Sequence, residues 1–505
     1  MHGVPQREAT KFLKTGRAGE IKKKFSVGVR TKNLFAILLI LGSDLIILYL
    51  SLILAYFTRL YVLPQVHLAF QSTITPESLL NIWWFPLLCV IVLAREGLYH
   101  GRKPFWQEIQ AIIRGITWAI FFTIFVIFIN KSANVNSRPL ILMTYVYLVI
   151  IFPIIRMFFK KLLVKIGLWK KPIIILGTRK AAHLISSALS RESNMGFYPM
   201  GLLEYNNQKE KGTSDSNHDI PVLGKFADAT EVLKRTNVKD VIIVAPDMDD
   251  LELVDLTNKL QKCANVMLIP SLVGLPLTSI KIGYFFNEKT LILSINNNLA
   301  SVSNRIFKRI FDLSVSLLLL PIILPILGVI ALAIRVDSKG PVIFAQKRVG
   351  HGGKTFNCFK FRTMIMDAQK VLENILDSDP QTRKEWEADF KLKNDPRITR
   401  VGKFLRRTSL DEFPQLLNVM LGQMSFVGPR PIIEDEIEKY GSYFQDFTMV
   451  LPGITGLWQV SGRNDVSYDE RVQLDIWYVR NWSLWLDIEI LLRTVSVVLN
   501  GKGAY

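Results

Sequence analysis

Two adjacent carboxylates, Asp411 and Glu412, are the residues of this 505-residue chain whose types and surroundings say most about chemistry. The segment around them is rich in cations, at Arg400, Lys403, Arg406, Arg407 and Arg430. One carboxylate can attack phosphorus while the other holds a divalent metal, and fixed positive charges suit a phosphate ester as substrate. The pattern therefore indicates chemistry on a phosphate ester.

The same acids also fit a purely structural role. The spacing of Ser409 and Glu412 is that of a capping box, in which both acids would only begin the following helix. On spacing alone this interpretation is favoured, although Pro414 would then lie inside the helix and proline prefers its first position. The two roles are compatible, because a helix N-terminus also binds phosphate.

Further cations could hold the phosphate groups. Alternation along the strand predicted over 355–363 places Lys360 and Arg362 on one face, where they could grip a diphosphate. A solvated strand face is the alternative. Arg430 stands between two prolines, a rigid frame that suits a bidentate phosphate contact.

The elements that must position these residues include membrane helices. Half of the residues are hydrophobic and the net charge is +19, so anionic lipid or a phosphorylated substrate is favoured over nucleic acid as partner. After a basic cytoplasmic segment at 1–33, the region 34–171 is expected to form a four-helix transmembrane bundle with both ends in the cytoplasm. Four buried helices of a soluble domain are the alternative. The apolar segments lie near 34–57, 79–94, 109–130 and 139–158.

A Rossmann-like α/β domain is expected over 172–285, followed by a linker at 286–304. Buried strands are predicted at 172–177, 241–246 and 266–270, with a helix over 181–190. The turn after Gly177 lacks the second and third glycines of a dinucleotide-binding fingerprint. A structural or regulatory domain is therefore favoured over one that binds a cofactor.

The apolar segment 311–334 differs from the bundle helices. Basic residues flank it on both sides, and each flank prefers the cytoplasm, which argues against crossing. Pro321 and Pro325 near its middle remove backbone donors and bend the helix. We expect a re-entrant helix that enters the membrane and returns to the same face. A kinked spanning helix and a buried core helix are the alternatives.

Five motifs in order, at 308–312, 360–364, 409–412, 425–431 and 452–456, resemble the bacterial sugar transferases, the monotopic phosphoglycosyl transferase superfamily. This resemblance covers 305–505, which is then a mainly helical catalytic domain. The preceding bundle and degenerate nucleotide-binding-like domain resemble those of the long polyprenyl-phosphate hexose-1-phosphate transferases. Residues 386–397 look closest to the branch that transfers galactose-1-phosphate.

The resemblance implies roles for individual residues. Asp411 matches the nucleophile that attacks a UDP-sugar and releases UMP, and Glu412 matches the acid that coordinates Mg²⁺. Arg406 and Arg430 match positions near the phosphates, and Arg463 matches a further binding arginine. In a second step, undecaprenyl phosphate would take the phosphosugar from the aspartate. Pro325 matches the helix-breaking proline; Leu324 stands where some members have serine.

The resemblance also implies a cellular setting. It predicts a homodimeric enzyme of the bacterial inner membrane, with its catalytic domain on the cytoplasmic face, that begins O-antigen, capsule or exopolysaccharide synthesis. UDP-glucose instead of UDP-galactose as donor, or a non-catalytic membrane scaffold of polysaccharide export, are the alternatives. An oxidoreductase acting on nucleotide sugars is disfavoured by the incomplete glycine fingerprint at 177–182.

Overall fold

The computed structural model divides into two compact units, residues 1–272 and 273–505. Each unit has hydrophobic cores of its own. The structure describes residues 18–66, 79, 82–130, 137–204, 220–244, 248, 250–269, 280–285, 290–295, 298–378, 395–461 and 466–500.

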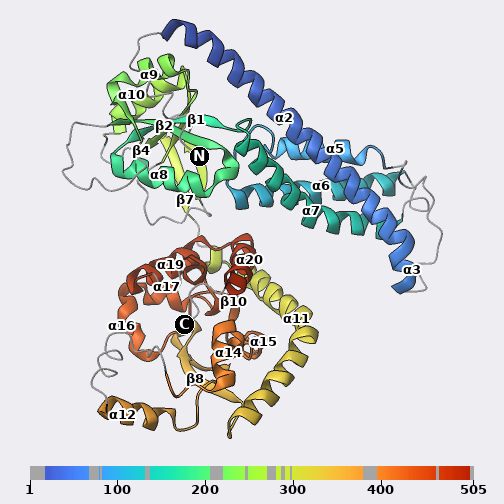
Figure 1. Ribbon diagram of the computed structural model, residues 1–505, viewed down its shortest axis with the longest axis vertical. Coiled ribbons are helices and arrows are strands. Elements are labelled where there is room, and N and C mark those ends of the chain that lie inside the picture. Colours follow the sequence, from blue (N-terminus) through green and yellow to red (C-terminus); the bar gives the residue numbers. More distant parts are fainter. Residues whose placement is uncertain are drawn as a thin grey trace. The chain divides into compact units, whose positions relative to one another are not determined.

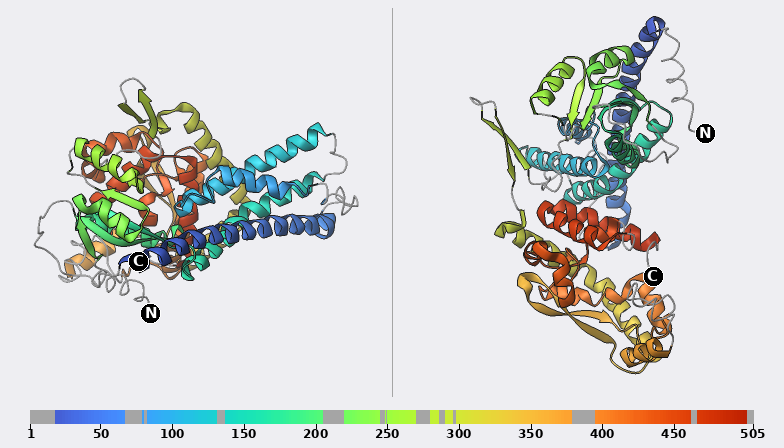
Figure 2. Two further views of the ribbon diagram at one scale, coloured as in Figure 1. Left: turned by 90° about the horizontal axis from the view of Figure 1, so that it is seen from above. Right: turned by 90° about the vertical axis from the view of Figure 1, so that its left-hand side faces the viewer.

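The first unit begins with a bundle of apolar helices that run side by side (Figure 2). Helix α2 (Ala18–Phe57) continues through the π-helical turn η1 (Thr58–Val62) into α3 (Leu63–Val66), and is followed by α5 (Phe85–Arg95), α6 (Phe105–Ile129) and α7 (Arg138–Lys165). Helices thus occupy the four apolar segments predicted for the bundle. Residues 32–66, α6 and α7 are long and apolar enough to cross a membrane, whereas the 11 residues of α5 fall short of the roughly 20 needed.

Both faces of α6 are apolar, which is typical of a helix in lipid. Its outward side chains, including Phe121, Phe125 and Phe128, are exposed, while Ile112, Ile116 and Ala119 lie in the bundle core. A soluble domain would place polar residues on the outer face. The alternative of a soluble helical domain is therefore disfavoured.

A buried ionic cluster joins three of the bundle helices. Arg156 on α7 contacts Asp44 on α2 and donates to Glu108 Oε1 on α6 at 3.0 Å, and Lys160 Nζ reaches Glu108 Oε2 at 2.7 Å. Two cations and two anions balance in charge, as buried ions in an apolar surrounding must. This cluster accounts for Asp44 and Arg156, two charged residues within the predicted apolar segments.

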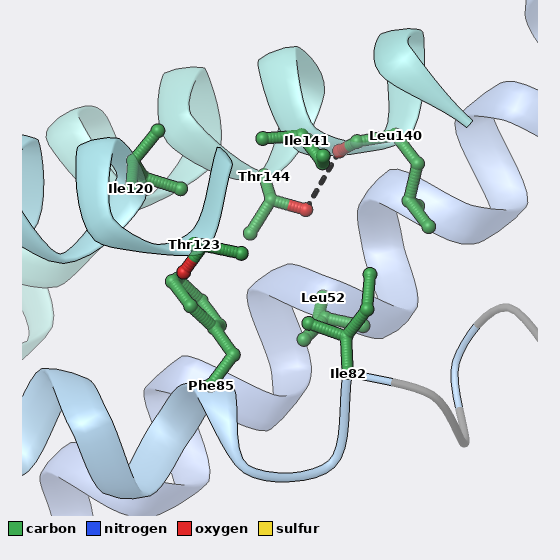
Figure 3. A pocket seen from close by; sticks show the side chains of 8 residues that line it. All are labelled: Leu52, Ile82, Phe85, Ile120, Thr123, Leu140, Ile141 and Thr144. Carbon is green, nitrogen blue, oxygen red and sulfur yellow. Dashed lines mark hydrogen bonds between the residues drawn. The ribbon is translucent and has the colours of Figure 1, made fainter. Parts of the chain in front are cut away.

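A small cavity of about 10 Å³ lies between the bundle helices (Figure 3). Leu52, Phe85 and Ile120 are among its lining residues, together with two threonines. Each threonine hydroxyl bonds to its own helix, Thr123 to Ala119 O and Thr144 to Leu140 O, both at 2.8 Å. The cavity is no larger than a water molecule requires, so it is a packing gap.

The α/β domain of this unit holds a parallel five-stranded sheet of order β3-β2-β1-β4-β5. The strands are β1 (Lys171–Gly177), β2 (Phe197–Glu204), β3 (Val222–Lys225), β4 (Asp240–Val244) and β5 (Asn265–Leu268), with helices α8 (Arg179–Arg191), α9 (Ala229–Thr236) and α10 (Asp250–Gln261). This is the predicted Rossmann-like topology. A Cβ on Gly177 would lie 2.6 Å from Val244 O, so this glycine serves the close pairing of β1 with β4.

The second unit is mainly helical, as expected. It contains two antiparallel hairpins and a parallel strand pair: β6 (Ile280–Phe285) with β7 (Thr290–Ile295), β8 (Ile343–Val349) with β9 (Thr355–Phe361), and β10 (Ser425–Val427) with β11 (Gly453–Thr455). The helices that matter for the site are α11 (Val302–Asp337), α14 (Arg400–Thr408), α15 (Gln415–Met420), α16 (Ile437–Tyr440), α18 (Leu457–Ser461), α19 (Tyr468–Asn481) and α20 (Leu484–Asn500). Strand β7 lies within the region expected to be a linker.

Helix α11 is apolar, contains Pro321 and Pro325, and bends along its length (Figure 1). Most of its hydrophobic side chains are exposed, which fits contact with lipid. At its N-terminal end, Lys308 Nζ donates to Val427 O at 3.0 Å and to Asp487 Oδ2 at 2.7 Å. Asp312 Oδ1 accepts from Phe426 N at 3.3 Å. The base of α11 is thus bonded to β10, the strand that leads into the Arg430 loop.

Candidate active site

The two acids lie on a 3₁₀ turn, η8 (Leu410–Glu412), between α14 and α15. Ser409 ends α14 in the left-handed conformation, with φ 57°, and its side chain makes no capping hydrogen bond. Pro414 comes immediately before the first residue of α15. The capping-box interpretation is therefore wrong: Ser409 turns the chain between two helices, and the acids are displayed on that turn.

Two of the cations singled out in the sequence, Lys360 and Arg406, lie near the acidic pair. Lys360 Nζ on β9 lies 2.7 Å from Glu412 Oε1. Arg406 on α14 donates from Nε to Thr363 Oγ1 at 3.0 Å, and its charge acts on Asp411. Burial and the neighbouring Glu412 raise the pKa of Asp411, while Lys360 and Arg406 oppose that rise. A partly buried carboxylate between a like charge and two cations results.

Arg362 occupies a different place from its predicted partner Lys360. Its Nη2 donates to Ser338 O at 2.7 Å and to Ser338 Oγ at 2.9 Å, just beyond the end of α11. Arg362 follows the last residue of β9, and its side chain is buried. The structure brings Lys360 to the acids and directs Arg362 to the end of the membrane helix, where it holds α11 to the hairpin.

Arg430 projects from a loop whose backbone is closely held. Gly428 N donates to Thr455 O at 3.0 Å, and Gly453 N donates to Pro429 O at 2.8 Å. A Cβ on Gly428 would lie 2.5 Å from Leu451 O, so only glycine fits there. The Arg430 side chain is exposed, and its Cζ lies 5.8 Å from the centre of the Trp458 ring. A fixed backbone thus presents a solvent-accessible guanidinium.

Sequence reasoning missed Arg348 as a member of this site. Its Nη1 on β8 donates to Pro431 O at 3.2 Å and lies 3.8 Å from Glu436 Oε2. Burial and the charge of nearby Arg430 lower the pKa of Arg348. No motif in the sequence pointed to it, because its role depends on the pairing of β8 with β9. Arg463, the remaining predicted binding residue, lies outside the described residues.

The acids fit the metal that the resemblance implies. Mg²⁺ is usually held by one or two carboxylates together with phosphate oxygens and water. No group of three or more potential metal-binding side chains occurs in the described part of the chain. Glu412 beside Asp411 offers hard oxygen donors, and their mutual repulsion would be relieved by a cation.

Comparison with known proteins shows which families this chain resembles. Residues 303–501 match the bacterial sugar transferase family, and residues 78–270 match a family described as a CoA-binding domain. An undecaprenyl-phosphate galactose phosphotransferase of Salmonella typhimurium is 43% identical over 81% of this chain and 84% of that protein. A UDP-galactose-lipid carrier transferase of Erwinia amylovora is 40% identical over 85% of this chain and 87% of that protein.

A relative of lower identity is named for glucose, not for galactose. The UDP-glucose:undecaprenyl-phosphate glucose-1-phosphate transferase of Klebsiella pneumoniae is 33% identical over 68% of this chain and 70% of that protein. These similarities extend through both units. The chain belongs to the bacterial sugar transferase family.

Proposed function

We propose that this protein transfers galactose-1-phosphate from UDP-galactose to undecaprenyl phosphate, the step that begins assembly of a surface polysaccharide. The observation that carries the proposal is the η8 turn, which presents Asp411 and Glu412 together against Lys360 and Arg406. Such a site favours charge that develops on phosphate during transfer.

The first step is nucleophilic. A carboxylate oxygen of Asp411 attacks the sugar-bearing phosphorus, the bond from that phosphorus to the bridging oxygen breaks, and UMP leaves with the electron pair. Lys360, Arg406 and Arg430 would neutralise charge on the diphosphate. A phosphosugar remains bonded to Asp411, so a soluble donor and a lipid acceptor can use one site in turn.

In the second step, an oxygen of undecaprenyl phosphate attacks the same phosphorus and the bond to Asp411 breaks, which regenerates the carboxylate. The acceptor's phosphate has to reach η8 from the membrane. A bent α11 with exposed apolar sides, joined by Arg362 to the hairpin that carries Lys360, supports a re-entrant helix on the cytoplasmic side of the inner membrane.

Magnesium would be held by Glu412, with Asp411 close by. When bound, Mg²⁺ supplies positive charge that stabilises the diphosphate and the leaving group. Within the protein, Lys360 keeps Glu412 oriented through its ion pair. Arg406 is anchored by Thr363, so its charge stays next to Asp411.

Galactose is proposed as the sugar because two relatives at 40% and 43% identity are named for galactose, whereas two relatives named for glucose are 33% and 32% identical. Membranes containing the protein should transfer radiolabelled sugar phosphate from UDP-galactose, but not from UDP-glucose, to undecaprenyl phosphate. Asp411→Asn should abolish the product. Asp367→Asn, the same change at an exposed acid of the same unit, should retain it. Normal lipid-linked product from Asp411→Asn would favour the scaffold alternative.

A further inference from the structure

The loop that carries Arg430 has one main-chain donor left to account for. Pro429 and Pro431 have no N–H, and the N–H of Gly428 is bonded to Thr455 O. The carbonyl of Pro431 accepts from Arg348, and that of Ile432 accepts from Val349 N at 2.8 Å. The remaining donor between Gly428 and Pro431 is the N–H of Arg430, and it faces the carboxylate of Asp475.

Asp475 lies on α19 and is buried, with 1% of its surface exposed. Its Oδ2 accepts from Tyr440 OH on α16 at 3.0 Å, whereas Oδ1 has no close hydrogen-bond partner among the residues that the structure describes. A buried carboxylate with one hydrogen bond is costly unless another donor or a cation compensates it. The main-chain N–H of Arg430 acts on this carboxylate and can compensate it in part.

The charged and titratable groups that act on Asp475 come from three elements. Tyr440 is on α16, Tyr468 and Tyr478 are on α19 itself, and Arg430 is on the loop after β10. Of these four residues only Arg430 is a cation. The negative charge of Asp475 is therefore opposed by Arg430, the residue that we assign to the diphosphate of the UDP-sugar.

We propose that Asp475 is a positioning residue, which holds the main chain of Arg430 so that the guanidinium meets the diphosphate of the sugar donor. The inference rests on the proposed phosphate-binding role of Arg430. Asp475 itself is too buried to touch the substrate.

The protonation state of Asp475 should change near neutral pH. Burial raises the pKa of Asp475 to about 7, although Tyr440 and Arg430 pull it down. The carboxylate that attracts Arg430 is therefore lost as the pH falls through about 7. Because the pKa of this acid is higher in the folded than in the unfolded chain, its ionisation works against folding as the pH rises. Removal of the charge should consequently not destabilise the protein in mild alkali.

The test is Asp475→Asn in the full chain, with kcat and KM for UDP-galactose measured at about pH 6 and about pH 8, on either side of the pKa. Asparagine can still accept from Tyr440 but has neither the charge nor a second acceptor. The ratio of variant to wild-type KM should rise from near unity at the lower pH to roughly tenfold at the higher pH, as expected for loss of a hydrogen bond to a charged group. The thermal midpoint at the higher pH should be unchanged or higher.

Asp446→Asn is the matched control, because Asp446 pairs with Arg480 at 2.7 Å near the surface. Its KM ratio should not depend on pH. A pH-independent ratio for Asp475→Asn, or a lower thermal midpoint with normal KM, would overturn the positioning role. Arg430→Lys separates the two proposals. An unchanged KM in Arg430→Lys would contradict the phosphate-binding role of Arg430. A raised KM in Arg430→Lys together with a normal KM in Asp475→Asn would contradict only the positioning role of Asp475.

Discussion

In the proposed mechanism Asp411 must be ionised to attack phosphorus, and its neighbours affect the pH at which this carboxyl ionises. Burial and Glu412 raise the pKa of Asp411, and Lys360 acts against them. Lys360→Gln removes a positive charge, so the pKa of Asp411 should rise further. The acid limb of the pH profile of kcat/KM should then move to higher pH. Lys354→Gln, at an exposed position of the same hairpin, should leave the pH profile unchanged. An unshifted acid limb in Lys360→Gln would contradict the role of Lys360 beside Asp411.

Residue types and spacing predicted the acids and the cations near them, but not the local geometry. The left-handed Ser409 was invisible to pattern reasoning, because serine rarely adopts φ 57° and the spacing of 409–412 fits a capping box. The contact of Arg362 with Ser338 could not be foreseen either. Alternation predicts the face of a strand, whereas Arg362 has already left β9.

At the scale of elements, Arg362 serves as the connection between the end of α11 and the β8–β9 hairpin. Arg362→Met removes the bonds to Ser338 and should lower the free energy of unfolding of the second unit by about 2 kcal/mol. Lys360→Met, two residues earlier in the chain, should raise KM for UDP-galactose. Its loss of stability should be smaller, because Lys360 is partly exposed. Thermal unfolding and donor kinetics of both variants make the comparison. Equal loss of stability in the two would argue against this division of roles.

The path of α11 through the membrane is open to direct measurement. Arg305 lies in the first turn of α11 and Lys339 lies just beyond its end, and both are exposed. Arg305→Cys and Lys339→Cys should react with an impermeant thiol reagent from the cytoplasmic side only. Cys263 should first be replaced by serine, since Cys89 and Cys358 are buried. Two further variants mark the two sides of the membrane. Lys170→Cys lies beyond the C-terminal end of α7, and Asn130→Cys lies at the C-terminal end of α6. Reaction of position 339 together with position 130 would indicate a spanning helix.

At the scale of the whole molecule, every described residue of the proposed site lies in the second unit, which has its own cores and its own apolar helix. A chain of residues 298–505 should therefore retain transfer to undecaprenyl phosphate. Detergent-solubilised protein, with wild type and Asp411→Asn of the same length as references, would provide the assay. A folded but inactive short chain would mean that the first unit contributes to the reaction.

The sequence predicted the larger architecture better than its details. Long apolar runs and prolines indicated the bundle and α11, because length and composition alone decide those elements. Strands β2 and β3 were missed: Pro199 and Gly201 interrupt the first, and the second has only four residues. The contribution of Arg348 and Asp475 depends on segments far apart in the sequence, which one chain without its fold does not reveal.

A single-turnover experiment can detect the proposed covalent bond between Asp411 and the phosphosugar. Purified protein is mixed with UDP-galactose radiolabelled in the sugar, without undecaprenyl phosphate. We expect release of UMP in an amount matching the enzyme, and label that remains on the peptide containing Asp411 until the acceptor lipid removes it. Label that never appears on an active enzyme, or that appears equally on Asp411→Asn, would contradict the proposed covalent bond.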